Sequence, residues 1–573
     1  MFKILMKHWA VIALFFVALT PAQAFTKDQI EIEAPGIASA HPLATQAGFK
    51  ILEQGGNAFD AAVAVSAALS VVEPYSSGIG GGGFFLLYRS RDNFTTFVDA
   101  REVAPGKSEP DMYLDSDRNF IHRSSLVGPL ASGIPGLPAA LVHVAENYGQ
   151  LPLNQSLQPA IRLAEEGFPV YSRLNTALNV ARRSSSLSSK FKEIFLANNE
   201  LPQIGKLIKQ PELANTLKII ANHGHDGFYK SDFTKKVVEE TNRDGSIWSV
   251  DDFSEYKVVE RQPVKISFEN AEITLAPPPS SGGTTIATIL NILSQYDYQE
   301  MGDSELTHLI AESMRRAYQD RAYYLGDPDF ADVPVEMLIH PDHAIKHSTS
   351  IDLKRATPIH LNDDRILVSH DKGTETTHFS IVDTEGNRVA TTQTINTWFG
   401  SGYMSPSGGF ILNNEMDDFS AKPFTPNRYG LVHGETNSIL PKKRMLSSMT
   451  PSFIESDKGI AILGSPGGSK IITMVLLSIL NWMNGGTADD MTSVKRFHHQ
   501  YLPDVIQHEK GAFSNSDIDK LKSIGHTLKE VRDYGNMQVI TIDKDTGKVE
   551  TSSDPRALIE DSGIDYYLSL IHI

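Results

Sequence analysis

The sequence predicts an α+β fold in which helices are layered on antiparallel sheets. Segments with the alternating pattern of strands come in blocks along the 573 residues, and blocks of helical pattern lie between them. The chain has no cysteine, so no disulfide can hold it together. A chain of this length can bury a core large enough to fold without disulfides.

The composition excludes several classes of protein. The formal net charge is −17, and no block of Lys and Arg offers the basic face that a nucleic-acid-binding protein needs. Hydrophobic residues make up 41% of the chain and charged residues 21%, which is typical of a folded globular protein. The absence of cysteine also excludes thiolate catalysis and cysteine-ligated metal sites.

Residues 1–24 have the pattern of a signal peptide. Lys3 and Lys7 precede an apolar run at 9–19 that is too short to span a bilayer comfortably, and a small-x-small pattern ends at Ala24. We expect cleavage after Ala24 and a periplasmic or secreted product that is not bound to a membrane. An uncleaved membrane anchor is the alternative.

The expected helices and strands follow from periodicity and from turn residues. The segment 58–73 is apolar nearly all round, so it should be a buried helix. Other helical patterns lie at 44–54, 135–225, 304–324 and 470–484. Strand patterns lie at 77–90, 94–102, 264–277, 377–383, 387–396, 409–414, 452–465 and 537–553. The polar run at 370–375 should be an exposed loop.

Two glycine-rich stretches resemble nucleotide-binding motifs. Residues 78–83 fit G-x-G-x-x-G, but a dinucleotide site needs a strand before the turn and a helix after it, and here the order is reversed. Close packing of the backbone at a sheet edge is the expected role of this turn. The loop 464–470 lacks key residues of a P-loop or a nucleophile elbow, yet its free N–H groups could form an oxyanion hole.

The histidines form two local groups, His498 with His499 and His340 with His343 and His347. Neither group has the H-E-x-x-H pattern of a zinc protease. We expect these side chains to make ordinary hydrogen bonds, and the sequence predicts no metal site.

Three threonines crowd the beginning of the strand at 377–383, namely Thr374, Thr376 and Thr377. A threonine hydroxyl is a poor nucleophile without a base. If the preceding peptide bond is cut, the new α-amino group can serve as that base, since its unperturbed pKa is roughly 7.7–8.0. Threonine is also common at strand beginnings in purely structural roles, so this cluster alone does not establish a nucleophile.

Charged and hydroxyl-bearing residues elsewhere could bind the head of an amino acid. Carboxylates can hold an ammonium group, and an arginine with hydroxyl groups can hold a carboxylate. Each such residue by itself could equally be a solvated charge or a turn residue. The candidates are Arg101, Glu415, Asp417, Asp418, Ser447 and Ser448.

Several longer motifs occur in a fixed order along the chain. They are EQGGNAFDAAVA, GIGGGGFFL, DARE, PPPSSGG, YLGDPDF, TTHFSIVD, NNEMDDFSAKP, RMLSSMTP, GSPGGS and SSDPR. With these motifs, the sequence from residue 34 to Arg556 resembles the bacterial γ-glutamyltransferases (γ-glutamyltranspeptidases), which are N-terminal-nucleophile hydrolases. The ending at 565–573 does not continue the resemblance, and no function is assigned to it.

The resemblance implies a four-layer αββα sandwich built from two subunits. The precursor would cut itself between Glu375 and Thr376. The large subunit (25–375) and the small subunit (376–573) would then stay together as one domain. Thr376 would be the nucleophile, and Thr394 would hydrogen-bond it and assist the self-cleavage.

The resemblance also implies a role for each remaining site residue. The N–H groups of Gly467 and Gly468 would stabilise the oxyanion, and Tyr429 would belong to a lid at 420–434. The residues that would hold the α-carboxylate of the donor are Arg101, Ser447 and Ser448. The residues that would hold its α-ammonium are Asn396, Glu415 and Asp418.

The implied reaction passes a γ-glutamyl group from glutathione or a related donor to water, an amino acid or a peptide. No cofactor, metal ion, nucleic acid or membrane partner is expected. A glutaryl-type β-lactam acylase of the same fold is the alternative enzyme, but a glutaryl group has no ammonium for the acidic residues to hold. An uncleaved binding protein of the same fold is the non-enzymatic alternative, and the intact Thr376 and Thr394 argue against it.

Overall fold

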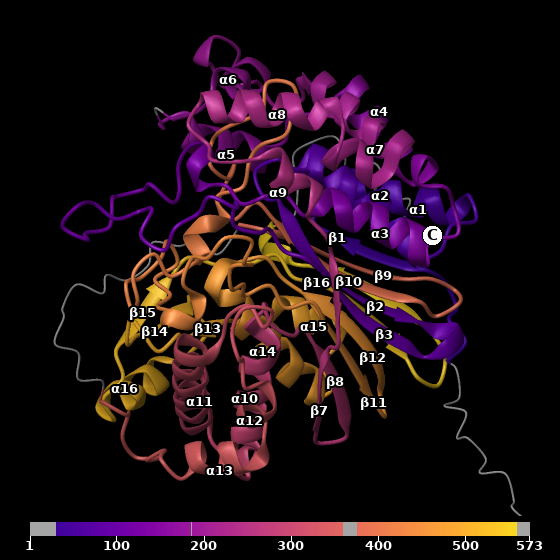
Figure 1. Cartoon of the computed structure of the whole chain (residues 1–573). Helices are drawn as coiled ribbons and strands as arrows, with labels where there is room; N and C mark the ends of the chain where they lie inside the picture. Colours follow the sequence, from indigo (N-terminus) through magenta and orange to yellow (C-terminus); the bar gives the residue numbers. More distant parts are fainter. Residues whose placement is uncertain (1–29, 185, 359–374, 558–573) are drawn as a thin grey trace, which may run out of the picture.

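The computed structural model describes residues 30–184, 186–358 and 375–557, which form four layers (Figure 1). Two six-stranded sheets lie face to face, and helices cover the outer face of each. All neighbouring strands within these two sheets are antiparallel. The αββα architecture that the resemblance implies is therefore confirmed.

Each of the two large sheets combines strands that precede Thr376 with strands that follow it. The order in the first sheet is β1 (Gly36–Ser39), β9 (Thr377–Val382), β10 (Arg388–Thr394), β2 (Gly82–Arg89), β3 (Phe94–Ala100) and β6 (Val259–Arg261). The order in the second is β17 (Val549–Ser553), β16 (Gln538–Asp543), β12 (Gly459–Gly464), β11 (Ser452–Ser456), β8 (Ala271–Leu275) and β7 (Val264–Phe268). Smaller sheets join β4 (Phe168–Pro169) to β5 (Leu207–Ile208), and β13 (Phe497–His498) to β14 (Ile506–Glu509) and β15 (Leu528–Val531).

The helices divide between the two outer layers (Figure 1). The layer on the first sheet holds α1 (Pro42–Glu53), α2 (Ala58–Val72), α3 (Leu137–Tyr148), α4 (Leu153–Glu166), α5 (Ser172–Ala181), α6 (Ser189–Phe195), α7 (Pro211–Tyr229), α8 (Asp232–Arg243) and α9 (Val250–Ser254). The layer on the second sheet holds α10 (Gly282–Leu293), α11 (Asp303–Tyr324), α12 (Val335–Leu338), α13 (Pro341–Ser348), α14 (Ile471–Met483), α15 (Ala488–Ser493) and α16 (Asn515–Ser523).

The helix α2 is buried along its whole length, as its continuous apolar pattern predicts. Its first turn is closed by a capping box between Asn57 and Asp60. The N–H of Ala58 donates to the carboxylate of Asp383, just beyond β9, at 2.8 Å. Because α2 presents mainly small side chains, β9 and β10 can pack closely beneath it.

The central strands are buried on both faces. Phe85 and Leu87 of β2 belong to the core under the helices of the first layer. Phe84 and Leu86 alternate with them and belong to the core that faces the second sheet. The predicted hairpin at 77–102 is thus an interior part of the molecule.

The glycine turn before β2 packs against other backbone segments, as expected. A Cβ on Gly80 would lie 2.1 Å from the carbonyl oxygen of Ile411, and one on Gly81 would lie 2.0 Å from that of Thr394. Carbonyl oxygens so close to the turn would repel a phosphate group. The structure therefore agrees with the packing role and not with a nucleotide site.

Most of the expected elements are present, but one expected strand is absent and several observed elements were not expected. The segment 409–414 is not a strand: Ile411 makes a single isolated bridge with Met404. Gly409 has a φ of 65°, and the side chain of Asn413 donates to the carbonyl of Gly80, so this segment bends into a loop against the glycine turn. The helix α10, which follows the proline-rich loop at 277–283, has no counterpart among the predicted elements.

Several predictions concern residues outside the described ranges. These are the signal peptide at 1–24, nearly all of the loop at 370–375 and the ending at 565–573. Among the described residues, no helix is both long enough and apolar enough to cross a membrane.

The contact between the two sheets near Thr376 leaves no room for a side chain at Gly464, the last residue of β12. A Cβ at this position would lie 2.3 Å from the imidazole ring of His378 on β9. We expect Gly464→Ala to push the sheets apart and to lower the free energy of unfolding by about 1–3 kcal/mol.

Thermal and chemical unfolding measure this effect. Gly302→Ala is the matched control, because a Cβ on Gly302 meets nothing within 4 Å. A Gly464→Ala variant as stable as the unmodified protein would show that the sheets are not tightly packed here.

Candidate active site

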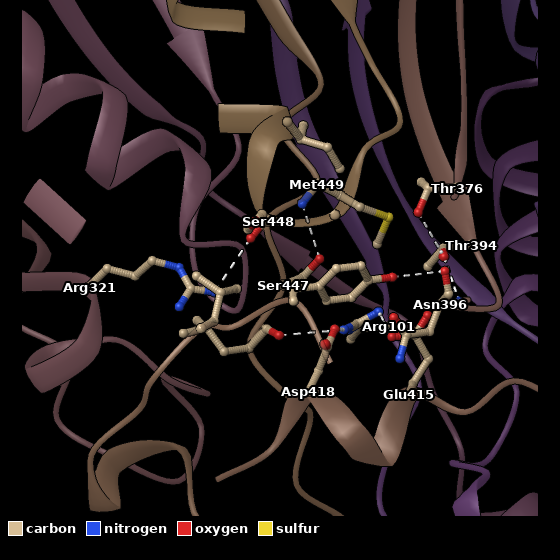
Figure 2. Close-up of a pocket in the computed structure, with 16 residues that line it drawn as sticks. Arg101, Arg321, Thr376, Thr394, Asn396, Glu415, Asp418, Ser447, Ser448 and Met449 are labelled. Atoms are coloured by element: carbon tan, nitrogen blue, oxygen red, sulfur yellow. Dashed lines mark hydrogen bonds and ion pairs between the residues drawn. The ribbon is translucent and has the colours of Figure 1, made fainter. Parts of the chain in front are cut away.

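Thr376 immediately precedes β9, and its side chain lines a pocket (Figure 2). Its hydroxyl donates a hydrogen bond at 3.0 Å to the hydroxyl of Thr394, at the end of the neighbouring strand β10. The Thr394 hydroxyl also accepts from the N–H of Asn396 at 2.7 Å, which fixes its position. The φ of Thr376 is 81°, an unfavourable value for a β-branched residue, so the backbone is strained at this point.

The carbonyl group that precedes Thr376 is held by the glycine loop after β12. The oxygen of Glu375 accepts a hydrogen bond from the N–H of Gly467 at 3.0 Å. Gly467 and Gly468 have φ values of 139° and 56°, in the region that favours glycine. The loop thus directs an N–H at a carbonyl oxygen, which is the arrangement of an oxyanion hole.

Glu375 is only 8% exposed. The sequence-based expectation of an exposed loop at 370–375 is therefore wrong for this residue. The reason is its hydrogen bond to Gly467, which holds the backbone against the second sheet. The rest of that run lies outside the described residues.

An ion-pair cluster around Arg101 forms one wall of the same pocket (Figure 2). Glu415 and Asp418 begin and end the 3₁₀ turn η5 (Glu415–Asp418), whose three residues per turn place both side chains on one face. Their carboxylates lie 2.7 and 2.6 Å from the Arg101 guanidinium, and that of Glu102 lies at 3.5 Å. When all three carboxylates are ionised, they outnumber the one guanidinium and leave a local surplus of negative charge.

Burial and charge shift the pKa values of this cluster. Burial raises the pKa of Glu102 to about 7 and that of Glu415 well above its usual range, although Arg101 opposes both shifts. Burial raises the pKa of Asp418 in the same way. Burial alone would lower the pKa of Arg101, but the surrounding carboxylates outweigh it and the pKa is raised. A second cation in the pocket would stabilise the ionised carboxylates.

Ser447, Ser448 and a second guanidinium, that of Arg321, line another part of the pocket. The Ser447 hydroxyl accepts from the N–H of Met449 at 3.1 Å, and the Ser448 hydroxyl accepts from Arg321 at 3.4 Å. Arg321 also donates to the hydroxyl of Ser281 at 2.9 Å, and burial lowers its pKa to about 10. No carboxylate in the described part of the chain forms an ion pair with Arg321, so its charge is available for an anion.

Arg321 is absent from the sequence-based candidates. It follows Ala317 by four residues on α11, in register with Ile310 and Met314, which belong to the buried apolar stripe of that helix. The signal in the sequence that could have identified Arg321 is a charged residue in register with an otherwise apolar helix face. Only the structure shows that this stripe ends at the pocket.

The segment 420–434 folds over the pocket. Tyr429 is 4% exposed, and its hydroxyl donates to the backbone oxygen of Asn396 at 3.1 Å. The side chain of Asn427 accepts from the N–H groups of Tyr429 and Leu431, which shapes the segment into a tight turn. Tyr429 thus lines the pocket from this segment.

Asp417 does not join the cluster around Arg101, although the sequence groups it with Glu415 and Asp418. Its carboxylate accepts from the hydroxyl of Ser125 at 2.6 Å and from the N–H of Arg428 at 2.9 Å. It therefore anchors the segment over the pocket and does not line the pocket itself. The predicted residues that do line the pocket are Arg101, Thr376, Thr394, Asn396, Glu415, Asp418, Tyr429, Ser447, Ser448 and Gly468.

Within the described ranges, two groups of residues could hold a metal ion, and neither lines the pocket. They are His308, Glu312 and His526, and Asp320, His343 and His347.

Comparison with known protein families gives one match across most of the chain. The family model described as Gamma-glutamyltranspeptidase matches residues 44–563. The glutathione hydrolase proenzyme of Escherichia coli (strain K12) is 41% identical over 527 residues, covering 91% of this chain and 90% of that protein. The glutathione hydrolase proenzyme of Bacillus subtilis (strain 168) is 36% identical, covering 92% and 91%.

Solved structures with a similar fold include two kinds of enzyme. A cephalosporin acylase from Bacillus halodurans has a TM-score of 0.80 at 25% identity, covering 95% of this chain and 98% of that one. The γ-glutamyltranspeptidase of Helicobacter pylori has a TM-score of 0.55 at 39% identity, covering 56% of this chain and 93% of that one.

The buried position of Asp417 predicts a pH effect on stability. Burial raises its pKa to about 6 from the ordinary value of 3.8. Between these values the folded protein holds a proton that the unfolded chain has released, so stability falls as the pH rises through this window and levels off above it. Asp417→Asn removes this titration.

We therefore expect the melting temperature of Asp417→Asn, relative to the unmodified protein, to increase from pH 4 to pH 6 and then to stay constant. Asp519→Asn, at an exposed position on α16, is the control. A difference in melting temperature that does not vary with pH would mean that Asp417 is ionised throughout.

Proposed function

Because the chain belongs to the γ-glutamyltranspeptidase family, we propose that its pocket transfers γ-glutamyl groups through an ester on Thr376. The enzyme is of the γ-glutamyltransferase and glutathione hydrolase type. The observation that carries the proposal is that one pocket holds both the Thr376 hydroxyl and the cluster around Arg101. The first can form an acyl-enzyme, and the second can hold the head of an amino acid.

The first step is a self-cleavage between Glu375 and Thr376. The Thr376 oxygen bonds to the Glu375 carbonyl carbon, the C–N bond breaks, and the nitrogen takes the hydroxyl proton. Water then hydrolyses the ester, leaving the Glu375 carboxylate and a free α-amino group on Thr376. The Gly467 N–H already donates to the carbonyl oxygen that becomes the oxyanion. The positive φ of Thr376 strains the backbone next to the bond to be cut.

The two fragments, 25–375 and 376–573, would stay together after the cut. Each large sheet contains strands from both fragments, so separating the fragments would break both sheets. The proenzymes among the relatives support a precursor of this kind.

In turnover, the α-amino group of Thr376 takes the proton of its own hydroxyl as the oxygen attacks the γ-carbonyl of the donor. The leaving amine takes a proton and departs, and the γ-glutamyl ester remains on Thr376. Water or the amine of an amino acid or peptide then attacks the ester and restores the hydroxyl. The N–H groups of Gly467 and Gly468 hold the oxyanion in both steps, and the Thr394 hydroxyl positions the nucleophile.

The donor head fits the charge distribution of the pocket. The carboxylates of Glu415 and Asp418, together with the side chain of Asn396, would hold the α-ammonium. Arg101, Ser447 and Ser448 would hold the α-carboxylate, with Arg321 as a further cation on the same side. Binding a zwitterion far from the γ-carbon can position that carbon at Thr376. Glutathione, the substrate in the names of the relatives, is the expected donor.

The lid segment would control water. With Tyr429 over the pocket, bulk water is kept from the acyl-enzyme until an acceptor enters.

A glutaryl-type β-lactam acylase remains the second candidate, because the cephalosporin acylase from Bacillus halodurans has a similar fold. A glutaryl group lacks the ammonium that Glu415 and Asp418 would pair with. Buried carboxylates left without such a partner would weaken its binding. The acid cluster therefore favours γ-glutamyl donors.

Export is part of the proposal. The pattern of residues 1–24 supports a cleaved signal peptide and a periplasmic or secreted enzyme.

Self-cleavage predicts two chains in the purified protein. Intact-mass measurement with N-terminal sequencing should find a smaller chain beginning Thr376-Thr377-His378. Thr376→Ala should remain one chain, and Thr394→Val should mature at least about tenfold more slowly, since a hydrogen bond at the nucleophile is lost.

Thr391→Val is the matched control for Thr394→Val, because Thr391 lies buried on the same strand and its hydroxyl makes no hydrogen bond with any described residue. A single uncut chain from the unmodified gene would refute the maturation scheme.

The acid cluster predicts donor selectivity. We expect kcat/KM for γ-glutamyl-p-nitroanilide to exceed that for glutaryl-p-nitroanilide by about 100-fold, because the ammonium pairs with ionised carboxylates. Glu415→Gln should lower the first value roughly 10- to 100-fold and leave the second nearly unchanged. Exposed Glu435→Gln is the control. Equal rates on both donors would support the acylase.

A further inference from the structure

Three side chains outside the active site point their ligand atoms at one another. Asp320 lies on α11, and His343 and His347 lie one turn apart on α13. The Nε2 atoms of the two imidazoles lie 2.7 and 2.8 Å from the same carboxylate oxygen of Asp320. The two rings are 4.3 Å apart, and the three side chains are 12–15% exposed.

We propose that Asp320, His343 and His347 bind a divalent transition-metal ion of the zinc class. Two histidines at i and i+4 of a helix present their nitrogens on one face, and a carboxylate from the facing helix completes a set of three protein ligands. Imidazole and carboxylate together suit Zn²⁺, Co²⁺ and Ni²⁺ better than Ca²⁺ or Mg²⁺. The partial exposure allows water to be the fourth ligand.

The site needs only a small opening to take the ion. Ligand bonds of about 2.0–2.1 Å in a tetrahedral arrangement place neighbouring ligand atoms roughly 3.3 Å apart. The present separations of 2.7 and 2.8 Å are hydrogen bonds, so each contact would widen by roughly half an ångström. All three ligand atoms already lie within 4.8 Å of one another. The hydrogen bonds expected from the sequence are thus the metal-free state of the same site.

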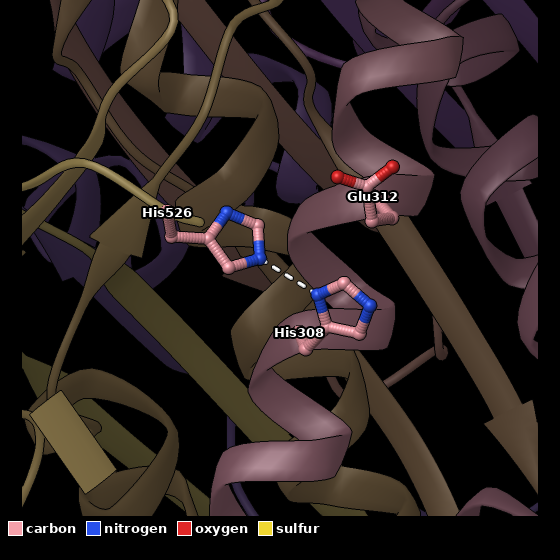
Figure 3. Close-up of side chains that lie close together, drawn as sticks. All are labelled: His308, Glu312 and His526. Atoms are coloured by element: carbon pink, nitrogen blue, oxygen red, sulfur yellow. Dashed lines mark hydrogen bonds between the residues drawn. The ribbon is translucent and has the colours of Figure 1, made fainter. Parts of the chain in front are cut away.

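The second group of possible metal ligands, His308, Glu312 and His526, is less suited to bind an ion (Figure 3). His308 and His526 are hydrogen-bonded at 2.7 Å, but Glu312 lies between two guanidiniums. Arg315 donates to it at 3.1 Å and Arg316 at 2.7 Å, and despite burial these charges lower its pKa to about 2. The guanidiniums already neutralise this carboxylate and would repel a metal ion. Asp320 instead receives its two short hydrogen bonds from imidazoles, which can be neutral ligands.

A bound ion would tie α13 to α11. This matters because α11 also carries Arg321, the residue after Asp320, into the active-site pocket. Since the unfolded chain does not hold the three ligands together, binding would stabilise the folded protein in proportion to the ion concentration. We assign the ion a structural role and no part in the acyl transfer.

The test uses the full-length enzyme without a histidine tag, freed of metal by a chelator. Titration with Co²⁺ at pH 7.5 should saturate at one equivalent, with the visible absorption of tetrahedral Co²⁺, and Zn²⁺ should displace it. Excess Zn²⁺ should raise the melting temperature. His343→Ala, His347→Ala and Asp320→Asn should each weaken Co²⁺ binding by at least about tenfold.

His340→Asn is the matched control. His340 lies on the same segment and caps α13, and asparagine keeps that cap while removing the imidazole. It should bind Co²⁺ as the unmodified protein does. Circular dichroism confirms that each variant is folded, and Asp320→Asn keeps the side-chain volume if an alanine variant fails to fold. The proposal is overturned if Co²⁺ does not bind saturably, or if folded His343→Ala and Asp320→Asn bind it unchanged.

Discussion

The active site depends on the central position of β9. This strand pairs with β1 on one side and β10 on the other, with α2 above it and β12 and β16 below. Thr376 is therefore held in the interior of the fold. If it were already a chain terminus during folding, its charged amino group would have to be buried away from water. The proposed cut after folding would resolve this constraint, because the neighbours of β9 would already be in place when the new amine appears.

In the proposed scheme, the contacts around the Glu375–Thr376 bond would serve the precursor and the mature enzyme alike. The same Gly467 N–H that now bonds the Glu375 oxygen would meet the oxygen of a donor carbonyl once the Glu375 carboxylate has moved away. In the proposed mature state, the Thr394 hydroxyl would keep its partner and its own anchor, the N–H of Asn396. In the proposed scheme, self-cleavage and turnover are the same acyl transfer, performed first on the chain and then on a substrate.

Electrostatic complementarity would favour a zwitterionic donor in the proposed reaction. The carboxylates of Glu415 and Asp418 outnumber the charge of Arg101, while Arg321 lies on the other side of Ser448 with no carboxylate partner in the described part of the chain. The pocket is therefore locally negative at one end and positive at the other. A zwitterion satisfies both ends, whereas an acyl group with a single carboxylate satisfies only one.

The sequence by itself determined the elements whose pattern is local and the residues that belong to recognisable motifs. Patterns among neighbouring residues predict the apolar helix α2 and the strands β9 and β10. The close spacing of the acidic residues likewise indicates the turn at 415–418. The motifs identified Thr376, Arg101 and Gly467. Only the tertiary structure decided that Glu375 is buried, that Asp417 turns to Arg428 and that Arg321 reaches the pocket. It also decided that Asp320 meets two histidines of another helix. These contacts join residues far apart in the chain. The direction of a side chain across a packed interface is set by the element on the other side, and no local sequence pattern encodes that element's position.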